Sequence, residues 1–458
     1  MMKNIGLLLI AVATLCSCGV YKKYERPTDL DVEMTYRDIP MTKRGTASIG
    51  HLSWKELFKD PYLQSLIEEG LANNTELRTA HLKVEEAEAM LLNAKLSYLP
   101  SVSLSPEGTL SSFDGAKPSK TYSLAASASW EIDIFGKVTN AKREAKASLE
   151  GSIAYGQAVR TRLIATIADS YYTLLTLDRQ LAINQSTLES WDKSIRAMEA
   201  LKRAGESNDA AILQARANRL SLEASLWSTR QSIHETENSL SALLGVSPRQ
   251  IGRGTLEGQQ FPDTMAIGVP LQLLGDRPDV RQAEQELARS FYAANSARAA
   301  FYPSLTLGGS AGWTNNSGAA IVNPGNLLLS TIGSLTQPLF NKGTNIANLK
   351  VAKAQQEEAK LAFRQALLEA GQEVNDALTQ WQMTNHRISL GNQQVETLQQ
   401  AVRKTELLMR HSSTNYLEVL TARQTLLSAE LTLAQSHFEK IQGVINLYHA
   451  LGGGSNEQ

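Results

Sequence analysis

The chain contains 458 residues, of which 20% are charged, and its formal net charge at pH 7 is −1. A chain of this length has room for about two to four globular domains. The balanced charge provides neither the basic stripe of a nucleic-acid-binding protein nor an acidic interaction tail, so nucleic acid is not an expected partner.

The first 17 residues have the pattern of a secretory signal peptide. Lys3 precedes an apolar run from Ile5 to Leu15, which is too short to cross a membrane as a helix. The ending Leu15-Cys16-Ser17-Cys18 resembles a bacterial lipobox, in which cleavage falls before the cysteine and its sulfur is acylated. The alternative is an ordinary cleavage site nearby, which leaves Cys18 as an exposed thiol. In either case the mature chain holds one cysteine and no disulfide.

The residue after Cys18 is Gly19 rather than aspartate. By resemblance to the sorting signals of enterobacterial lipoproteins, this indicates the outer membrane. Acyl chains contribute about 0.8 kcal/mol per buried methylene, and more than one chain makes such anchoring stable. The sequence therefore predicts a protein that is lipid-anchored at Cys18.

The body of the chain is a long internal duplication, which indicates two halves of a pseudo-symmetric subunit. Its offset is 203 residues early in each half (277 − 74) and 207 later (415 − 208). The aligned stretches are Asn74–Ala80 with Arg277–Ala283, Tyr98–Val102 with Phe301–Leu305, and Asn208–Arg216 with Asn415–Arg423. The predicted organisation is a signal peptide (1–17), an anchored N-terminal and equatorial segment (18–73), a first repeat (74–248), a linker (249–276), a second repeat (277–452) and a flexible tail (453–458).

Each repeat is expected to contain a pair of β-strands. Apolar residues alternate with small or polar residues from Tyr122 to Ile134, and from Leu305 to Thr314. Val102 and Leu104 begin another such strand, and a fourth is expected over residues 327–339. Alternation over about ten residues is typical of transmembrane β-strands. The candidates for an aromatic girdle at the membrane interfaces are Tyr122, Trp130 and Trp313.

A proline-free tract rich in helix-forming residues follows each strand pair. One helix from Lys137 to about Asn184 would be roughly 70 Å long at about 1.5 Å per residue. Its counterpart would run from near Gly343 to about Asn385. A cytosolic coiled coil is the alternative interpretation, but the signal peptide and the duplicated strands both argue against it.

Four strands cannot close a barrel in a membrane. Membrane barrels begin at about eight strands, and an open edge in lipid leaves backbone groups without hydrogen bonds. Either the strands form a soluble sheet, or several chains contribute to one barrel. The signal peptide and the aromatic positions favour the second. The expected fold class is mixed and mainly α, with long coiled-coil-like helices and four strands per chain in a shared β-barrel.

Ordered motifs occur from residue 54 to residue 378. They are Trp54–Leu63, Leu273–Val280 with Ala283-Glu284, Ala297–Leu305, Gln337–Phe340 and Glu373–Leu378. The first two resemble the W-x-x-F-x-D-P-x-L and L-L-x-x-R-P-D-[IV]-x-x-A-E signatures of TolC-type outer membrane efflux proteins, in the OprM- and NodT-like lipoprotein branch. The resemblance implies a homotrimer with one twelve-stranded barrel in outer membrane lipid and a large periplasmic α-barrel.

The resemblance also implies a function and partners. The chain would be the exit duct of a tripartite efflux system, passively conducting drugs or other small molecules. Its partners would be a periplasmic adaptor protein and an inner-membrane pump of the resistance-nodulation-division type. The alternative is a periplasmic structural or adhesion coiled-coil lipoprotein that never spans lipid.

In this family the periplasmic end is closed at rest by polar and charged contacts. Aligning the repeats places helix bends near Asp178-Arg179 and near Asn385-His386-Arg387, so Asp178 and Arg387 are the gate candidates. Gly205 matches the family's glycine in the equatorial turn, whereas Ser412 takes that place in the second half. The carboxylates of Glu369, Glu373 and Asp376 share one helix face, as either a lumenal acidic ring or an ordinary solvated face.

The sequence shows no arrangement typical of catalysis. The seven histidines are scattered and lack the spacing of a metal site. The run Gly308–Gly312 lacks the lysine that follows a phosphate-binding loop, and it lies within an alternating strand. No nucleophile stands with a base. An enzyme is therefore not expected, and neither is a metal or a cofactor.

Overall fold

The computed structural model describes residues 23–27, 49–112, 114–203, 209–261, 277–315, 326–410 and 416–454. The lipidation candidate Cys18, together with Gly205 and Ser412, lies outside these residues. The chain divides into two compact units. The first comprises residues 1–30, 82–154 and 281–365, and the second comprises residues 31–81, 155–280 and 366–458. Both repeats therefore contribute to each unit.

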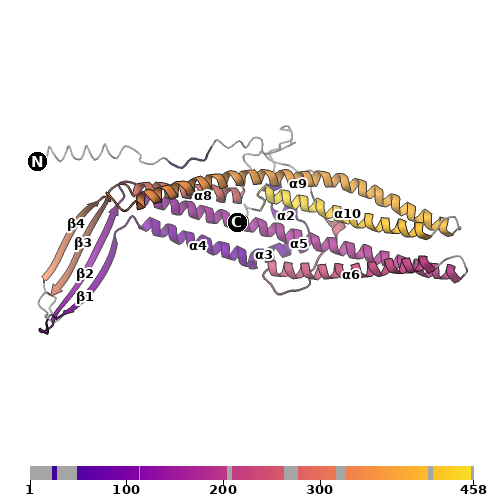
Figure 1. Cartoon of the computed structure of the whole chain (residues 1–458), viewed down its shortest axis with the longest axis horizontal. Helices are drawn as coiled ribbons and strands as arrows, with labels where there is room; N and C mark the ends of the chain where they lie inside the picture. Colours follow the sequence, from indigo (N-terminus) through magenta and orange to yellow (C-terminus); the bar gives the residue numbers. More distant parts are fainter. Residues whose placement is uncertain are drawn as a thin grey trace. The chain divides into compact units, whose positions relative to one another are not determined.

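The first unit contains a four-stranded antiparallel sheet (Figure 1). Its strands are β1 (Ser101–Ser111), β2 (Ser119–Ile132), β3 (Ser304–Asn315) and β4 (Asn326–Thr336), in that spatial order. β1 and β2 come from the first repeat, β3 and β4 come from the second, and the pairing of β2 with β3 joins the two repeats. The four predicted strands are thus confirmed, although β4 ends at Thr336 rather than near residue 339.

The helices repeat the same lengths in both halves of the chain. α4 (Thr75–Leu96) and α8 (Pro278–Ala299) each have 22 residues. α5 (Lys137–Arg203) and α9 (Thr344–Arg410) each have 67 residues, and α6 (Asp209–Leu243) and α10 (Tyr416–Ala450) each have 35. The starts of α5 and α9 differ by 207 residues (344 − 137), as do those of α6 and α10 (416 − 209). The predicted duplication is confirmed element by element.

The long helices extend beyond the ends predicted near Asn184 and Asn385, so that Asp178 and Arg387 lie within continuous helices rather than next to a helix end. α5 continues to Arg203 and α9 continues to Arg410. Between residues 179 and 203 there is no glycine or proline to end the helix. The residues that prolong α5 are also well packed, since Ile183, Trp191 and Met198 are buried.

Short helices of the N-terminal segment build the main core of the second unit. They are η2 (Ile49–His51), α2 (Trp54–Leu57) and α3 (Pro61–Asn73), and a further turn, η3 (Leu256–Gly258), comes from the segment between the repeats. This core also includes residues of α5 and α10, among them Ile164, Tyr171, Tyr172, Val444 and Tyr448. A second buried cluster joins α5, α6 and α10 further along these helices.

The C-terminal ends of α6 and α10 have the same kinds of stabilising contact in the two repeats. Gly245 and Gly452 have φ values of +73° and +75° just after α6 and α10, where glycine adopts a left-handed conformation without strain. The side-chain amide of Asn74 donates to the carbonyl of Leu243 at 2.8 Å. At the equivalent place, the guanidinium of Arg277 donates to the carbonyl of Ala450 at 2.8 Å. One contact is thus made by different residues in each half.

Within the described residues, no helix is both long enough and apolar enough to cross a membrane.

Candidate functional site

The sheet of the first unit has one hydroxyl-rich face. The register aligns Ser103 with Ser127, Ser127 with Ser310 and Ser310 with Ser330, so that one serine from every strand forms a row. The hydroxyl oxygens of Ser103 and Ser127 lie 2.8 Å apart. Side chains two residues apart share a face of a strand, and the neighbouring positions on this face are mostly Ser, Thr or Gly. Such a surface can be hydrated.

The opposite face of the sheet is apolar, and its side chains are exposed in the part of the chain that the structure describes. The register aligns Leu104 with Ala126, Ala126 with Ala311 and Ala311 with Leu329. Val102 and Leu329 are 74% and 71% exposed. A contiguous apolar surface of this kind needs lipid or another protein to remove it from water. The predicted alternation is therefore confirmed, and the four strands place their apolar residues together.

The three aromatic girdle candidates lie at opposite ends of the apolar face. The register pairs Trp313 with Leu124, next to Tyr122 along that face, and pairs Trp130 with Leu307 near the other end. Eight residues of extended chain between Tyr122 and Trp130 span about 27 Å, which is close to the roughly 25 Å apolar band of membrane barrels. The indole N–H of Trp130 donates to the carbonyl of Tyr98 at 2.9 Å. The role of Tyr122, Trp130 and Trp313 in an aromatic girdle stays a prediction.

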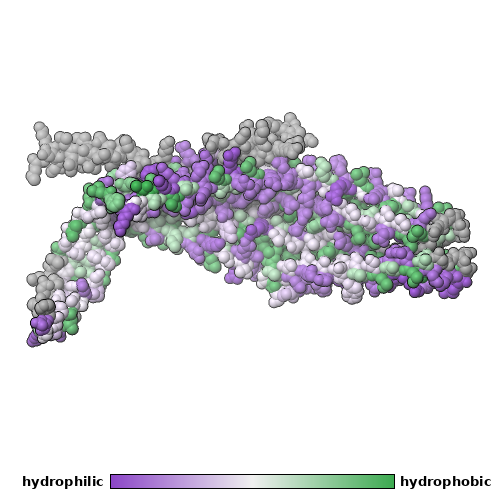
Figure 2. Space-filling model, in the orientation of Figure 1, coloured by the Kyte–Doolittle hydropathy of each residue, from purple (hydrophilic) through white to green (hydrophobic). Residues whose placement is uncertain are grey.

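Large apolar side chains also gather where the strands meet the helices. Figure 2 shows hydrophobic residues concentrated at this junction, whereas hydrophilic residues spread along the helices. Leu339 and Phe340, which follow β4, are 93% and 87% exposed. The rings of Phe135 and Tyr302 stack here with centroids 5.0 Å apart. The apolar surface thus extends beyond the strands to the first turns of the helices.

The R-P-D motif forms a buried ionic anchor in the second unit. The side chain of Arg277 is 3% exposed, and its guanidinium donates to the carboxylates of Asp279, at 2.6 Å, and Glu373, at 2.7 Å. Burial alone would raise the pKa of Asp279, but the hydrogen bond and charge of Arg277 lower it below its usual value. Glu373 is therefore paired within the chain, whereas the lumenal role of Glu369 and Asp376 stays a prediction.

Asp60, which precedes Pro61 in the first motif, is the centre of a second polar cluster. Asp60 caps α3 by accepting from the backbone N–H of Tyr62 at 2.9 Å. Its other carboxylate oxygen accepts from the hydroxyl of Tyr171 at 2.7 Å and from the side-chain amide of Gln259 at 2.8 Å. Burial raises the pKa of the Tyr171 hydroxyl, which therefore remains a donor. This cluster ties the N-terminal segment to α5.

The two gate candidates have other partners within the chain. The carboxylate of Asp178 accepts from Arg253, with the Nε–Oδ2 distance at 2.5 Å. Arg253 also donates to the buried carboxylate of Glu237 at 2.5 Å. Arg387 donates to Glu439 at 2.6 Å. The gate assignment stays a prediction, and both residues lie inside helices that continue to Arg203 and Arg410.

Sequence reasoning missed the buried Arg253–Glu237 pair. The charge of Glu237 on an apolar helix face, next to Leu240 and Ile233, was the available signal. The second repeat places Asn385 and Val444 where the first has Asp178 and Glu237 (178 + 207 and 237 + 207). It therefore lacks the two carboxylates that hold an arginine in the first repeat.

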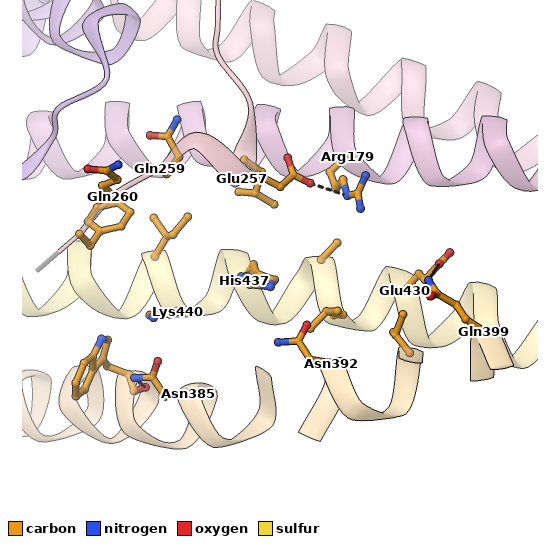
Figure 3. Close-up of a pocket in the computed structure, with 17 residues that line it drawn as sticks. Arg179, Glu257, Gln259, Gln260, Asn385, Asn392, Gln399, Glu430, His437 and Lys440 are labelled. Atoms are coloured by element: carbon orange, nitrogen blue, oxygen red, sulfur yellow. Dashed lines mark hydrogen bonds and ion pairs between the residues drawn. The ribbon is translucent and has the colours of Figure 1, made fainter. Parts of the chain in front are cut away.

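An open groove of about 970 Å³ lies beside Asn385, the equivalent of Asp178 (Figure 3). It is lined by α5, α9, α10 and residues 256–261. Arg179 and Glu257 form an ion pair across one side at 2.9 Å. Burial, together with the charge of nearby Lys440, lowers the pKa of His437 in its wall. Across the parts of the chain that the structure covers, no group of His, Cys, Asp and Glu side chains could hold a metal ion.

These features define a class of protein: a duplicated subunit with paired long helices and a sheet that is apolar on one face and hydroxyl-rich on the other. The chain belongs to the outer membrane efflux protein family, whose sequence profile matches residues 66–246 and 269–453. The predicted family is confirmed.

Individual relatives agree with this assignment. The chain is 28% identical over 460 residues to the cation efflux system protein CusC of Escherichia coli O6:H1, covering 98% of each protein. It is 31% identical to the pyoverdine export outer membrane protein OpmQ of Pseudomonas putida, covering 88% of each. The MtrE outer membrane channel of Neisseria gonorrhoeae, solved in its open state, matches with a TM-score of 0.84 at 28% identity, covering 95% of this chain and 98% of that one.

Proposed function

We propose that three copies of this chain form an outer membrane exit duct, which receives small molecules from an inner-membrane pump through a periplasmic adaptor protein. The observation that carries the proposal is the register of the sheet, which gives four strands one apolar and one hydroxyl-rich face. Three such sheets, joined β4 to β1, would make a twelve-stranded barrel with lipid outside and water inside. The two open edges of the sheet would then be paired.

The cargo of the duct is proposed to be set by the pump. The names of two relatives specify cations and pyoverdine, which differ greatly in size and charge. A lumen lined by serine, threonine and glycine provides water and hydroxyl groups rather than a shaped binding site. The row formed by Ser103, Ser127, Ser310 and Ser330 is an example. Passive conduction with little selectivity follows from that lining.

Conductance tests this proposal against the alternative of a periplasmic coiled-coil lipoprotein. Purified protein in detergent should have about three times the mass of one chain by light scattering, and it should produce discrete single-channel steps in planar bilayers. A periplasmic coiled coil would give neither β-sheet content in vesicles nor such steps. A monomer with full sheet content and no conductance would rule out the duct.

We also propose that Cys18 is the acylated mature N-terminus. The support is the Leu15-Cys16-Ser17 sequence before it and Gly19 after it. Cys18→Ser should accumulate as a longer precursor that takes up no labelled fatty acid. Normal processing and localisation of Cys18→Ser would contradict the lipoprotein assignment and leave the duct proposal unaffected.

A further inference from the structure

In the first unit, the helix ends next to the sheet have basic residues at equivalent positions in both repeats. Three pairs of positions match at the offsets of the duplication (95 + 203, 143 + 207 and 146 + 207). They are Lys95 with Arg298, Arg143 with Lys350, and Lys146 with Lys353. These six residues are called the basic collar below. Both repeats thus have positive charge at the same three positions, although the net charge of the whole chain is −1.

The basic collar lies close to the end of the apolar face of the sheet. Its first pair stands six residues before β1 and β3 (101 − 95 and 304 − 298). Its second and third pairs lie six and nine residues into α5 and α9, which is about 9 Å and 14 Å from the helix starts at about 1.5 Å per residue. Lipid headgroups form a layer of about 5–8 Å on each side of the hydrocarbon. Because long basic side chains can extend along apolar surface towards a headgroup, the collar can reach that layer.

Aromatic rings lie between the apolar face and the collar. The indole of Trp130 is held by the carbonyl of Tyr98, and the ammonium of Lys142 lies 5.5 Å from the centroid of the Tyr98 ring. The guanidinium of Arg143 lies 5.9 Å from the centroid of the Tyr292 ring. Aromatic rings beside Lys and Arg are typical of a membrane–water interface. These contacts place cations directly beside the aromatic end of the lipid-facing surface.

The acidic side chains near the start of α5 are engaged in contacts of their own. Glu131 accepts from Lys137 at 2.8 Å. Asp133 accepts from two backbone N–H groups in the first turn of α5, at 2.9 Å and 2.8 Å. Glu144 lies 3.8 Å from Arg289. None of these three carboxylates is paired with a residue of the collar.

The charge of the collar is therefore available to an external partner. Lys146, Lys350 and Lys353 are exposed, and the ion pairs among the described residues include none of them. Helix stability does not explain them either. The first turns of α5 and α9 contain no acidic residue, although acidic rather than basic side chains stabilise the start of a helix. An anion beside the collar would complement both the lysines and the helix starts.

We propose that the basic collar binds the phosphate groups of anionic phospholipids in the membrane leaflet that faces the helices. The apolar face of the sheet contacts the acyl chains, and the collar contacts the headgroups. The occupant is a lipid rather than a soluble anion because the collar continues a surface that needs lipid. Figure 2 shows hydrophilic residues directly beside the hydrophobic junction, where Leu339 and Phe340 are exposed. The proposal rests on the duct of the proposed function and adds a lipid preference to it.

Native mass spectrometry of the full-length trimer in detergent tests this preference. Phosphatidylglycerol, which is anionic, and phosphatidylethanolamine, which is zwitterionic, are added in equal amounts with identical acyl chains. The wild type should retain more phosphatidylglycerol, and added salt should reduce the difference because exposed charges are screened. Arg143→Gln, Lys146→Gln, Lys350→Gln and Lys353→Gln combined should lower the preference at least about tenfold, since one basic residue near an anionic surface contributes about fivefold.

The matched control removes the same number of exposed basic residues near the other ends of α5 and α9. It combines Lys193→Gln, Arg196→Gln, Arg403→Gln and Lys404→Gln. The control should remain a trimer by light scattering and keep the lipid preference of the wild type. Loss of the preference in the control to the same extent as in the collar variant would overturn the proposal, because any positive charge would then serve.

A variant that keeps the charge separates electrostatics from shape. Lys146→Arg, Lys350→Arg and Lys353→Arg combined should retain the preference for phosphatidylglycerol and its sensitivity to salt. If wild-type trimers conduct but retain both lipids equally, or prefer phosphatidylglycerol to the same extent at low and high salt, the collar proposal is overturned and the duct is not. If the wild type neither forms trimers nor conducts, both proposals fail.

Discussion

The two repeats have the same helices in the same order, yet equivalent residues have opposite surroundings. Leu427 of α10 is 7% exposed, and Leu220, its equivalent on α6, is 61% exposed. Both helices have 35 residues and similar apolar spacing. The difference arises because α10 has α5 beside it, whereas no helix among the described residues covers the equivalent face of α6. Helix formation is thus set locally, while burial is set by the neighbouring element.

Some contacts are kept in both repeats although the residues differ. Asn74 donates a hydrogen bond to the carbonyl of Leu243 in the last turn of α6, and Arg277 donates one to the carbonyl of Ala450 in the last turn of α10. Asn74 is a neutral cap, whereas Arg277 adds two ion pairs to the same contact. The second repeat therefore relies on buried charge at a place where the first relies on one amide.

The largest expected effect comes from removing that buried charge. Arg277→Ala leaves Asp279, Glu373 and the carbonyl of Ala450 without their donor. Because both carboxylates are about half exposed and can be hydrated, we expect a loss of about 2–4 kcal/mol rather than the full cost of a fully buried pair. Asn74→Ala should cost only about 1–2 kcal/mol, since it removes a cap and one hydrogen bond. Denaturant unfolding followed by circular dichroism measures both.

Arg78→Ala is the matched control for this pair, because Arg78 is an exposed arginine on the first turn of α4. Its change should stay within about 0.5 kcal/mol. If Arg277→Ala and Asn74→Ala cost the same, the distinction between an ionic and a neutral anchor is wrong.

The second prediction compares the buried face of α10 with the exposed equivalent face of α6. Leu427→Ala should lower the stability of the helical unit by about 2–5 kcal/mol at any protein concentration, because it opens a cavity within one chain. Leu220→Ala should act mainly on association. Its effect on the thermal midpoint should therefore shrink as protein concentration rises. Equal, concentration-independent losses in the two variants would show that α6 does not bind a second copy.

Much of the fold could be predicted from sequence because its signals are local and repeated. The alternation between Tyr122 and Ile132 and the proline-free tract after Lys137 specify a strand and a helix whatever their neighbours are. The offset of 207 then specifies the second copy. The sequence did not reveal where the long helices end, because the tract beyond Asp178 contains no glycine or proline and its packing partner α10 is more than 200 residues away.

Ion pairs were harder to predict from the sequence than helices and strands. Glu373 and Asp376 are three residues apart on α9, yet only Glu373 meets a buried arginine. Asp178 was matched to Arg387 by repeat alignment, whereas its actual partner Arg253 lies in the segment between the repeats. Such pairs join segments far apart in the chain, and nothing in the spacing of charged residues identifies which cation will reach which carboxylate.

The third prediction concerns pH and again distinguishes the repeats. His449, near the end of α10, has the small residue Ala242 as its equivalent (449 − 207). Burial, and then the nearby charge of Arg277, lower the pKa of His449, although Glu373 and Asp279 oppose this and Arg162 adds to it. A histidine whose folded pKa is lowered stabilises the fold fully above its unfolded pKa of about 6.5, and that stability declines as the pH falls towards the folded pKa.

Thermal midpoints between pH 7.5 and pH 5.5 should therefore fall for the wild type and fall less for His449→Gln. His437→Gln is the companion variant, because its pKa is also lowered by burial and it accounts for a separate share of the acid sensitivity. Identical pH profiles for His449→Gln and the wild type would show that His449 contributes nothing to this decline.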